Sequence, residues 1–243
     1  MNQRAIEFLH SGFWKVLDWI YPPVCAGCGE PGYRLCQVCK DKIKFVAINE
    51  GHNPDWAVLQ AQNPSPDCTD YKFVAIYEGV VRECIHALKY ENNQALGEMF
   101  SEWVADLLCK MSWQIDLIIP VPLSAERVRQ RGYNQSALIA KPLAIKIGAI
   151  YAPYGLKRIR NTPSQVGLSA QERRSNVEGA FQANPKVVAG KRVLLVDDVS
   201  TTGATIGACA AALKSAQTAD VFGVTVAGFT RNFPFAEGTL NQV

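Results

Sequence analysis

Two carboxylates and a turn of small residues lie side by side in the carboxyl-terminal third of the chain. Asp197 and Asp198 follow the apolar run 193–196 and precede the segment 201–205, which contains Gly203. The hydroxyls and backbone N–H groups of such a turn can surround a phosphate, and the positive end of a following helix strengthens the attraction. The carboxylates can accept hydrogen bonds from sugar hydroxyls or support a hydrated Mg²⁺. The pattern therefore predicts a phosphate site beside a polyol site, in preference to an acidic loop after an ordinary core strand.

Four cysteines form a second group of residues whose types and spacing could do chemistry. Cys25 and Cys28 make one Cys-x-x-Cys pair, and Cys36 and Cys39 make another after seven intervening residues. Four thiolates give a closed tetrahedral Zn²⁺ site with a structural role. A module this small has little core of its own, so the metal should supply most of its folding energy. Free core cysteines or a redox pair are the alternatives.

Two further possible metal ligands occur farther along the chain. His52 and Cys68 lie in a stretch rich in Asn, Pro, Gly and Asp. Neither has a partner at the spacing of metal ligands, so we interpret both as incidental.

Basic side chains supply candidates for binding an anion. Three arginines fall within five residues, just after the apolar run 115–122, and could clamp a diphosphate bidentately: Arg127, Arg129 and Arg131. A solvated basic turn is the alternative. Lys89 ends a predicted helix, where either the helix dipole or a ligand could account for it.

A long polar stretch is the third basic candidate. Residues 161–178 are polar and contain Arg173 and Arg174. A long polar segment inside a compact domain is more often a functional lid than a passive loop.

The composition suits one large domain with a small appendage. The chain has 243 residues, of which 48% are hydrophobic and 19% charged, and its net charge is +3. That charge is too small to argue for nucleic-acid binding by itself. No apolar run is long enough to span a bilayer, and charged residues interrupt the first twenty positions, so we expect neither a membrane span nor a secretory signal. Paired cysteines then favour a reducing cytoplasm.

Three segments are expected along the chain. Residues 1–47 should hold an amphipathic helix over 5–20 followed by the zinc module. The helix is rich in aromatic residues, and we favour packing against the main domain over a membrane or partner surface. Residues 48–70 should be a linker, and residues 71–243 the main domain.

The main domain is predicted to be α/β, with a mainly parallel sheet, helices on both faces and the ligand at the carboxyl ends of the strands. Asn134 should cap a helix that Pro142 kinks and Gly148 ends. The expected strands lie at 71–77, 115–122, within 149–160, at 193–196 and near 221–229. The expected helices lie at 79–90, 94–110, 135–147, just after Ser169, and from the small-residue turn to 216.

The run 193–205, VLLVDDVSTTGAT, resembles the signature of type I phosphoribosyltransferases, which bind 5-phosphoribosyl 1-diphosphate (PRPP). The resemblance implies that Asp197 and Asp198 hold the ribose hydroxyls of PRPP, which binds together with Mg²⁺. The 5′-phosphate would lie on Thr201, Thr202, Gly203, Ala204 and Thr205. It also makes the loop after Pro122 the diphosphate loop, with Arg129 and Arg131, and 161–178 the mobile loop, with Arg173 and Arg174. Lys89 would be a further phosphate contact.

A wider set of motifs resembles the ComF (competence protein F, GntX-like) family. It comprises the two cysteine pairs, YEG at 77–79, LKY at 88–90, IPVPL at 119–123, RGYNQ at 131–135, GLS at 167–169, ERR at 172–174 and VDDVSTTGAT. The resemblance covers about residues 20–230. It implies a zinc-binding module on a type I phosphoribosyltransferase domain, in a family associated with natural competence and the uptake of single-stranded DNA.

The chain departs from related proteins at three points. Tyr133 stands where the family often has Phe, which is a mild change. Many relatives carry further cysteine pairs before the main domain, where this chain has only Cys68, so the resemblance does not extend to a second zinc site. Purine-salvage enzymes often have an aspartate base where Thr201 stands, which counts against an oxopurine substrate.

Three functions are compatible with these features. The first is a ComF-type protein whose PRPP-binding domain acts in natural competence, with single-stranded DNA as a further ligand. The second is an active Mg²⁺-dependent phosphoribosyltransferase on an unidentified acceptor, with Asp197, Asp198, Arg129 and Arg131 as catalytic residues. The third is a non-catalytic assembly factor that docks on a competence channel or helicase at the inner face of the membrane.

Overall fold

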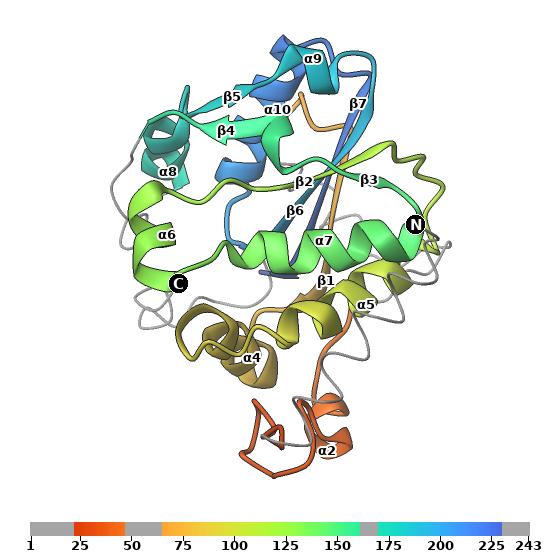
Figure 1. Ribbon diagram of the computed structural model, residues 1–243, viewed down its shortest axis with the longest axis vertical. Coiled ribbons are helices and arrows are strands. Elements are labelled where there is room, and N and C mark those ends of the chain that lie inside the picture. The colour runs from red at the N-terminus through yellow and green to blue at the C-terminus, as the bar shows by residue number, and fades with distance from the viewer. Residues whose placement is uncertain (1–21, 47–64, 161–169, 230–243) are drawn as a thin grey trace.

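The centre of the molecule is a five-stranded sheet in the order β1-β7-β6-β2-β3 (Figure 1). A computed structural model describes residues 22–46, 65–160 and 170–229. The strands are β1 (Asp70–Ile76), β2 (Leu117–Pro120), β3 (Ile150–Tyr151), β6 (Arg192–Ser200) and β7 (Asp220–Gly228). Every neighbouring pair in this sheet is parallel, which confirms the predicted parallel architecture.

Helices cover both faces of the sheet, as the continuous apolar strands require. One face carries α4 (Gly79–Tyr90), α5 (Leu96–Leu108) and α7 (Gln135–Ile147), and the other carries α10 (Ala204–Ser215). Successive residues of β6 alternate between the two cores: Leu194 and Val196 pack on the first side, Val193 and Leu195 on the second. The central strand is therefore buried on both faces, and polar residues can stand only at its ends.

One predicted strand proved to be two. We expected a single strand within residues 149–160, but β3 is followed by the short 3₁₀ turn η1 (Pro153–Gly155) and then by β4 (Leu156–Arg158). Pro153 lacks the N–H that a continuing ladder would need, so the chain leaves the main sheet there. β4 pairs antiparallel with β5 (Phe181–Ala183), and α9 (Pro185–Val188) leads back to β6.

The arginine-rich connection is also different from the prediction, because it forms the helix α6 (Ala125–Arg131). The Ser124 side chain caps this helix by accepting a hydrogen bond from the Arg127 N–H at 3.3 Å. Gly132, with φ of 79°, closes it in the left-handed conformation. The predicted cap of α7 is confirmed, since the Asn134 side chain accepts from the Ser136 N–H at 3.0 Å.

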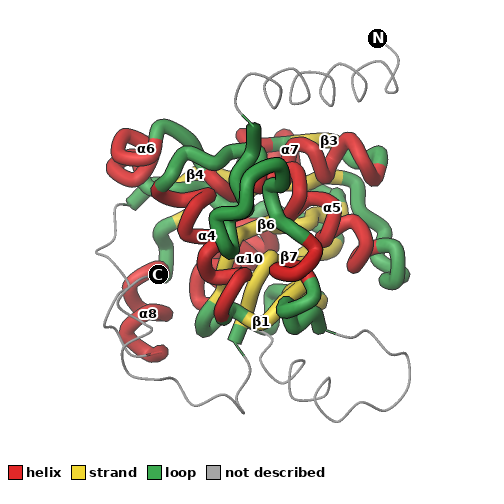
Figure 2. Tube along the Cα trace, turned by 90° about the horizontal axis from the view of Figure 1, so that it is seen from below, coloured by secondary structure: helices red, strands yellow, loops and turns green. Residues whose placement is uncertain are grey.

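The cysteine module, residues 22–46 with α2 (Gln37–Lys40), packs against the outer edge of the sheet near α4 and α5 (Figures 1 and 2). Its last residues run antiparallel to β1: the Val46 N–H donates to the Val74 carbonyl at 2.9 Å, and the Ile76 N–H donates to the Lys44 carbonyl at 3.0 Å. The Phe45 ring meets Trp103 edge-on at 5.1 Å.

Several predictions from the sequence fall outside the described residues. They are the helix over 5–20, most of the linker 48–70 with His52, and the capping residue Ser169. The short helix expected after Ser169 is present as α8 (Ala170–Val177). Within the described residues, no helix combines the length and the hydrophobicity needed to cross a membrane.

Candidate functional site

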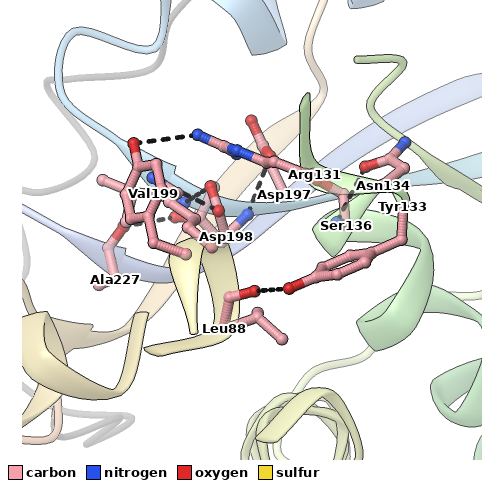
Figure 3. A network of polar contacts seen from close by, with 12 residues as sticks. Leu88, Arg131, Tyr133, Asn134, Ser136, Asp197, Asp198, Val199 and Ala227 are labelled. Atoms are coloured by element: carbon pink, nitrogen blue, oxygen red, sulfur yellow. Dashed lines mark hydrogen bonds and ion pairs between the residues drawn. The ribbon is translucent and has the colours of Figure 1, made fainter. Parts of the chain in front are cut away.

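The carboxylate pair stands near the carboxyl end of β6, between residues of α4 and α7 (Figure 3). Asp197 Oδ1 accepts a hydrogen bond from the Ser136 hydroxyl at 2.7 Å and one from the Asp198 N–H at 2.9 Å. Asp198 is 4% exposed, and its Oδ1 accepts from the Val199 N–H at 2.7 Å. Both carboxylates are therefore held in fixed orientations.

Lys89 lies beside this pair, and its role is more than a contribution to the helix dipole. Its Nζ is 3.5 Å from Asp198 Oδ2, and both side chains are buried. Asp198 Oδ2 accepts no hydrogen bond within the described part of the chain. A buried carboxylate oxygen with only an ion-pair partner has acceptor capacity left for a hydroxyl or a metal-bound water.

The same surroundings make Asp197 difficult to ionise. Burial and the neighbouring charge of Asp198 raise its pKa to about 7, although the Ser136 hydrogen bond and Lys89 act in the opposite direction. The two adjacent carboxylates repel each other, and hydrogen bonds from sugar hydroxyls or a bound cation would offset that repulsion. The pair is therefore better suited to a bound ligand than to the empty protein.

This pKa predicts the effect of Asp197→Asn on the ligand-free protein. The carboxyl titrates near 3.8 when unperturbed and near 7 when folded. Between these pH values the folded state holds a proton that the unfolded chain has released, so the cost of ionising Asp197 grows as the pH rises. We expect Asp197→Asn to melt slightly above the parent at pH 5 and several degrees further above it at pH 8, at roughly 2–4 °C per kcal/mol. Melting curves across this pH range measure the difference.

Asp116→Asn is the matched control, because it should change the melting temperature at pH 8 in the opposite direction. Arg192 binds both oxygens of Asp116, at 2.7 and 3.0 Å, and holds the pKa of that carboxyl well below its usual range. Its stabilising effect is present at neutral pH, so Asp116→Asn should melt below the parent at pH 8. An Asp197→Asn variant that lost stability equally at pH 5 and pH 8 would contradict the proposed repulsion.

The five small residues predicted to hold phosphate form one continuous turn into a helix. Gly203 has φ of 73° and serves as the N-cap of α10, which begins at Ala204. The Ala204 N–H lies 3.4 Å from the Thr202 hydroxyl. Because a left-handed residue is required at the cap, glycine is favoured there. The arrangement places hydroxyls and backbone N–H groups at the positive end of a twelve-residue helix.

The structure separates the predicted arginines. Arg131 donates to the Tyr90 hydroxyl at 3.1 Å, and its guanidinium lies 4.9 Å from the centre of that ring (Figure 3). Its Nη1 is buried without a hydrogen-bond partner in the described residues. Arg129 is exposed, two positions back on α6 and therefore on another side of that helix. The side chains of Arg173 and Arg174 lie outside the described residues.

Two contacts of this site were missed by the sequence reasoning. Ser136, which holds Asp197, follows the helix cap by two residues and looked like an ordinary first-turn serine. Tyr133 donates to the Leu88 carbonyl and so ties the start of α7 to the end of α4. Both contacts join segments that are distant in sequence, and only the strand order brings those segments together.

The four cysteines of the amino-terminal module form a second site. Their sulfur atoms all lie within 4.8 Å of one another, and Cys28 and Cys36 are 3.6 Å apart. Tetrahedral Zn²⁺ with Zn–S bonds of about 2.3 Å brings its sulfur ligands to roughly 3.8 Å of one another, so this donor set fits the metal. Cys68 is not part of the cluster; its buried thiol donates to the Asp70 carbonyl at 3.2 Å.

Two family models match the chain. One, a double zinc ribbon domain, matches residues 16–51, and the other, a phosphoribosyl transferase domain, matches residues 134–228. The first segment contains four cysteines, enough for one tetrahedral zinc ion. Together with the parallel sheet and the cysteine cluster, the matches define a phosphoribosyltransferase-type domain that carries a zinc ribbon.

Curated proteins of similar sequence identify the family. Competence protein F of Haemophilus influenzae is 32% identical over 196 residues, which are 75% of this chain and 80% of that protein. DNA utilization protein YhgH of Salmonella typhimurium is 33% identical over 197 residues, 77% of this chain and 81% of that protein. The chain belongs to the competence protein F (ComF) family, as its motifs predicted.

Solved structures with some likeness include phosphoribosyltransferases. Glutamine PRPP amidotransferase from B. subtilis is 22% identical and covers 58% of this chain and 26% of that chain, with a TM-score of 0.37. Adenine phosphoribosyltransferase from Thermoanaerobacter pseudethanolicus is 20% identical and covers 57% of this chain and 83% of that chain, with a TM-score of 0.36.

Proposed function

We propose that this chain binds Mg²⁺–PRPP, or a closely related ribose phosphate, at the carboxyl ends of β6 and β2, and that it acts in the uptake or use of DNA. The single observation that supports this best is the Asp197–Asp198 pair, which is followed within a few residues by a glycine-capped helix N-terminus. Acceptors for sugar hydroxyls and donors for a phosphate are thus presented on one short segment, at the spacing that a ribose 5-phosphate requires.

Each proposed contact has a chemical reason. The carboxylates of Asp197 and Asp198 accept hydrogen bonds from the ribose 2′- and 3′-hydroxyls, and the turn around Gly203 receives the 5′-phosphate. Mg²⁺ prefers oxygen ligands and neutralises the diphosphate when it is bound. Arg131 lies across the Tyr90 ring, has a buried Nη1 with no hydrogen-bond partner among the described residues, and is suited to the diphosphate end of the ligand.

The DNA part of the proposal comes from the names of the relatives, DNA utilization protein YhgH and Competence protein F. The arginines of α6 are suited to the phosphates of single-stranded DNA, which is the proposed partner of the same face. A four-thiolate zinc site is maintained best in a reducing compartment, so we place the protein in the cytoplasm, working at the inner face of the membrane.

Isothermal titration tests the proposal directly. We expect PRPP to bind the full chain in the presence of Mg²⁺, and to bind markedly more weakly when EDTA replaces the metal. Ribose, which lacks phosphates, shows how tightly the ligand binds without contacts to the turn. Inorganic phosphate shows how tightly the turn binds without contacts from the carboxylates to a sugar. PRPP binding no tighter than inorganic phosphate would contradict a built ribose site.

Single-stranded DNA belongs in a parallel titration. If it binds through phosphates, its affinity should fall steeply between low and physiological salt, because each neutralised phosphate releases counterions. Saturating PRPP should then weaken DNA binding if the two ligands share the arginine face. DNA binding that is unaffected by salt would contradict a contact made mainly through phosphates.

A further inference from the structure

A ring of hydrogen bonds, closed by one peptide bond, joins the start of α7 to the end of β6. The Ser136 hydroxyl donates to Asp197 Oδ1 at 2.7 Å, and the Ser136 N–H donates to Asn134 Oδ1 at 3.0 Å (Figure 3). Asn134 in turn donates from Nδ2 to the Val121 carbonyl at 3.0 Å. The Val121 N–H donates at 2.9 Å to the carbonyl of Val196, which immediately precedes Asp197. Each member of the ring therefore restrains the next.

The position of Ser136 in its helix explains why its hydroxyl reaches the strand. A serine inside a helix often turns its hydroxyl back to the carbonyl three or four residues before it. Ser136 is only the second residue of α7, so those carbonyls lie outside the helix. Its side chain leaves the helix instead and is buried, at 1% exposed. Tyr133 holds this end of the helix from the other side by donating to the Leu88 carbonyl of α4.

The hydrogen bond from Ser136 decides how the carboxylate of Asp197 is turned. The last side-chain torsion of an aspartate has broad minima, so the carboxylate needs partners to fix its direction. The two hydrogen bonds that Asp197 accepts from the described residues, from the Ser136 hydroxyl and the Asp198 N–H, both end on Oδ1. Oδ2 is then left for a sugar hydroxyl or a metal-bound water. Without Ser136, the hydrogen bond from the neighbouring N–H alone would hold the carboxylate.

We infer that Ser136 is a positioning residue for ribose binding: its hydroxyl occupies one oxygen of Asp197 and so directs the other oxygen to the ligand. This inference rests on the proposed function, because it assigns a support to that same site. It adds a residue from a helix sixty-one positions before the carboxylate.

The test compares Ser136→Ala with the parent in titrations of the full chain with PRPP plus Mg²⁺ and with inorganic phosphate. The variant removes one hydrogen bond but keeps the carboxylate, so we expect affinity for PRPP to fall about three- to tenfold. Inorganic phosphate, which would contact only the turn, should bind like the parent. Ser101→Ala is the matched control, because it removes another buried serine hydroxyl, which donates to the Glu98 carbonyl in α5 at 2.6 Å. It should leave the binding of both ligands unchanged.

A double-mutant cycle with Asp197→Ala shows whether Ser136 acts through the carboxylate. Alanine is used because an asparagine would still accept the hydrogen bond from Ser136. Adding Ser136→Ala to Asp197→Ala should cause no further loss of affinity for PRPP. The two losses would add if Ser136 acted through general stability.

Three results would overturn the inference and leave the proposed site standing. They are Ser136→Ala binding PRPP as tightly as the parent, equal losses of affinity for PRPP and for inorganic phosphate, and additive losses in the double variant. A parent protein that does not bind PRPP overturns the proposed function, and the inference with it.

Discussion

Replacing Cys39 with serine should remove the zinc and unfold the amino-terminal module. Cys39 is 2% exposed, and its sulfur is packed so closely that a Cβ at Gly27 would lie 2.8 Å from it. A hydroxyl of similar size can fill the space, but it cannot replace a thiolate ligand. Structural zinc contributes about 10–16 kcal/mol to the folding of small modules, so we expect the zinc content to fall from about one per chain toward zero. Metal analysis and hydrogen exchange over residues 22–46 measure the two effects.

Cys109→Ser is the matched control for this change. Cys109 is an exposed cysteine at the end of α5, outside the cluster, and its replacement should leave one zinc per chain. The unfolding should also extend beyond the module. Val80 of α4 packs against the cysteines, and Lys44 is 2.7 Å from Glu78, which precedes that helix. Rapid exchange confined to residues 22–46, with α4 unchanged, would mean that the module and the domain are independent.

The second large effect concerns the carboxylate pair. Asp197→Asn and Asp198→Asn should each weaken Mg²⁺–PRPP binding roughly ten- to hundredfold, since a hydrogen bond to a charged group contributes about 1.5–3 kcal/mol. Both variants should bind inorganic phosphate almost like the parent, because the phosphate lies in the turn and not against the carboxylates. Asp198→Asn should in addition destabilise the fold, because it leaves the buried Lys89 without its charged partner.

Thr202→Val supplies the contrasting pattern for this experiment. It removes a hydroxyl from the phosphate turn and keeps the size of the side chain. Its loss of affinity should be similar for PRPP and for inorganic phosphate, whereas the aspartate variants should discriminate between the two. If the aspartate variants bound PRPP like the parent and Thr202→Val also had no effect, the pocket would be a structural remnant, and the assembly-factor function would take its place.

Asp197→Asn should have opposite effects on the stability of the ligand-free protein and on ligand binding. Asp197→Asn is expected to raise the melting temperature at pH 8 and, at the same time, to weaken ligand binding. Repulsion between adjacent carboxylates is a cost that a binding site can carry when a ligand relieves it. A residue kept only for packing would not show this opposition.

Much of the fold could be predicted from the sequence because its signals are local. The helix after Asn134 has a capping side chain at one end and a left-handed glycine at the other. The central strand is a run of apolar residues that must be buried on both faces. The spacing of the two cysteine pairs is enough to predict that their four sulfur atoms lie close together. In each case the physical cause lies within a few residues of the effect.

What could not be predicted depends on contacts between distant segments. Lys89 lies in the last turn of its helix, and nothing near it in sequence shows that Asp198 lies within reach. The hydroxyl of Ser136 has no special neighbour along the chain that would indicate its contact with Asp197. These roles follow from the order of the strands. The helix α6 was missed for a different reason: its arginines have good helix propensity, but the chemistry of the clustered charges dominated our interpretation.

Residues 44–46 affect the tendency of the protein to aggregate with other copies of itself. β1 is an outer strand of the sheet, and its inner residues are buried and, apart from Lys72, apolar or aromatic. An outer strand that shows a row of unpaired N–H and C=O groups is a template on which another chain can add a strand and aggregate. The zinc ribbon lays its last residues along that row, while the opposite edge is kept short by the two residues of β3. Besides holding its metal, the small module therefore insulates the sheet against self-association.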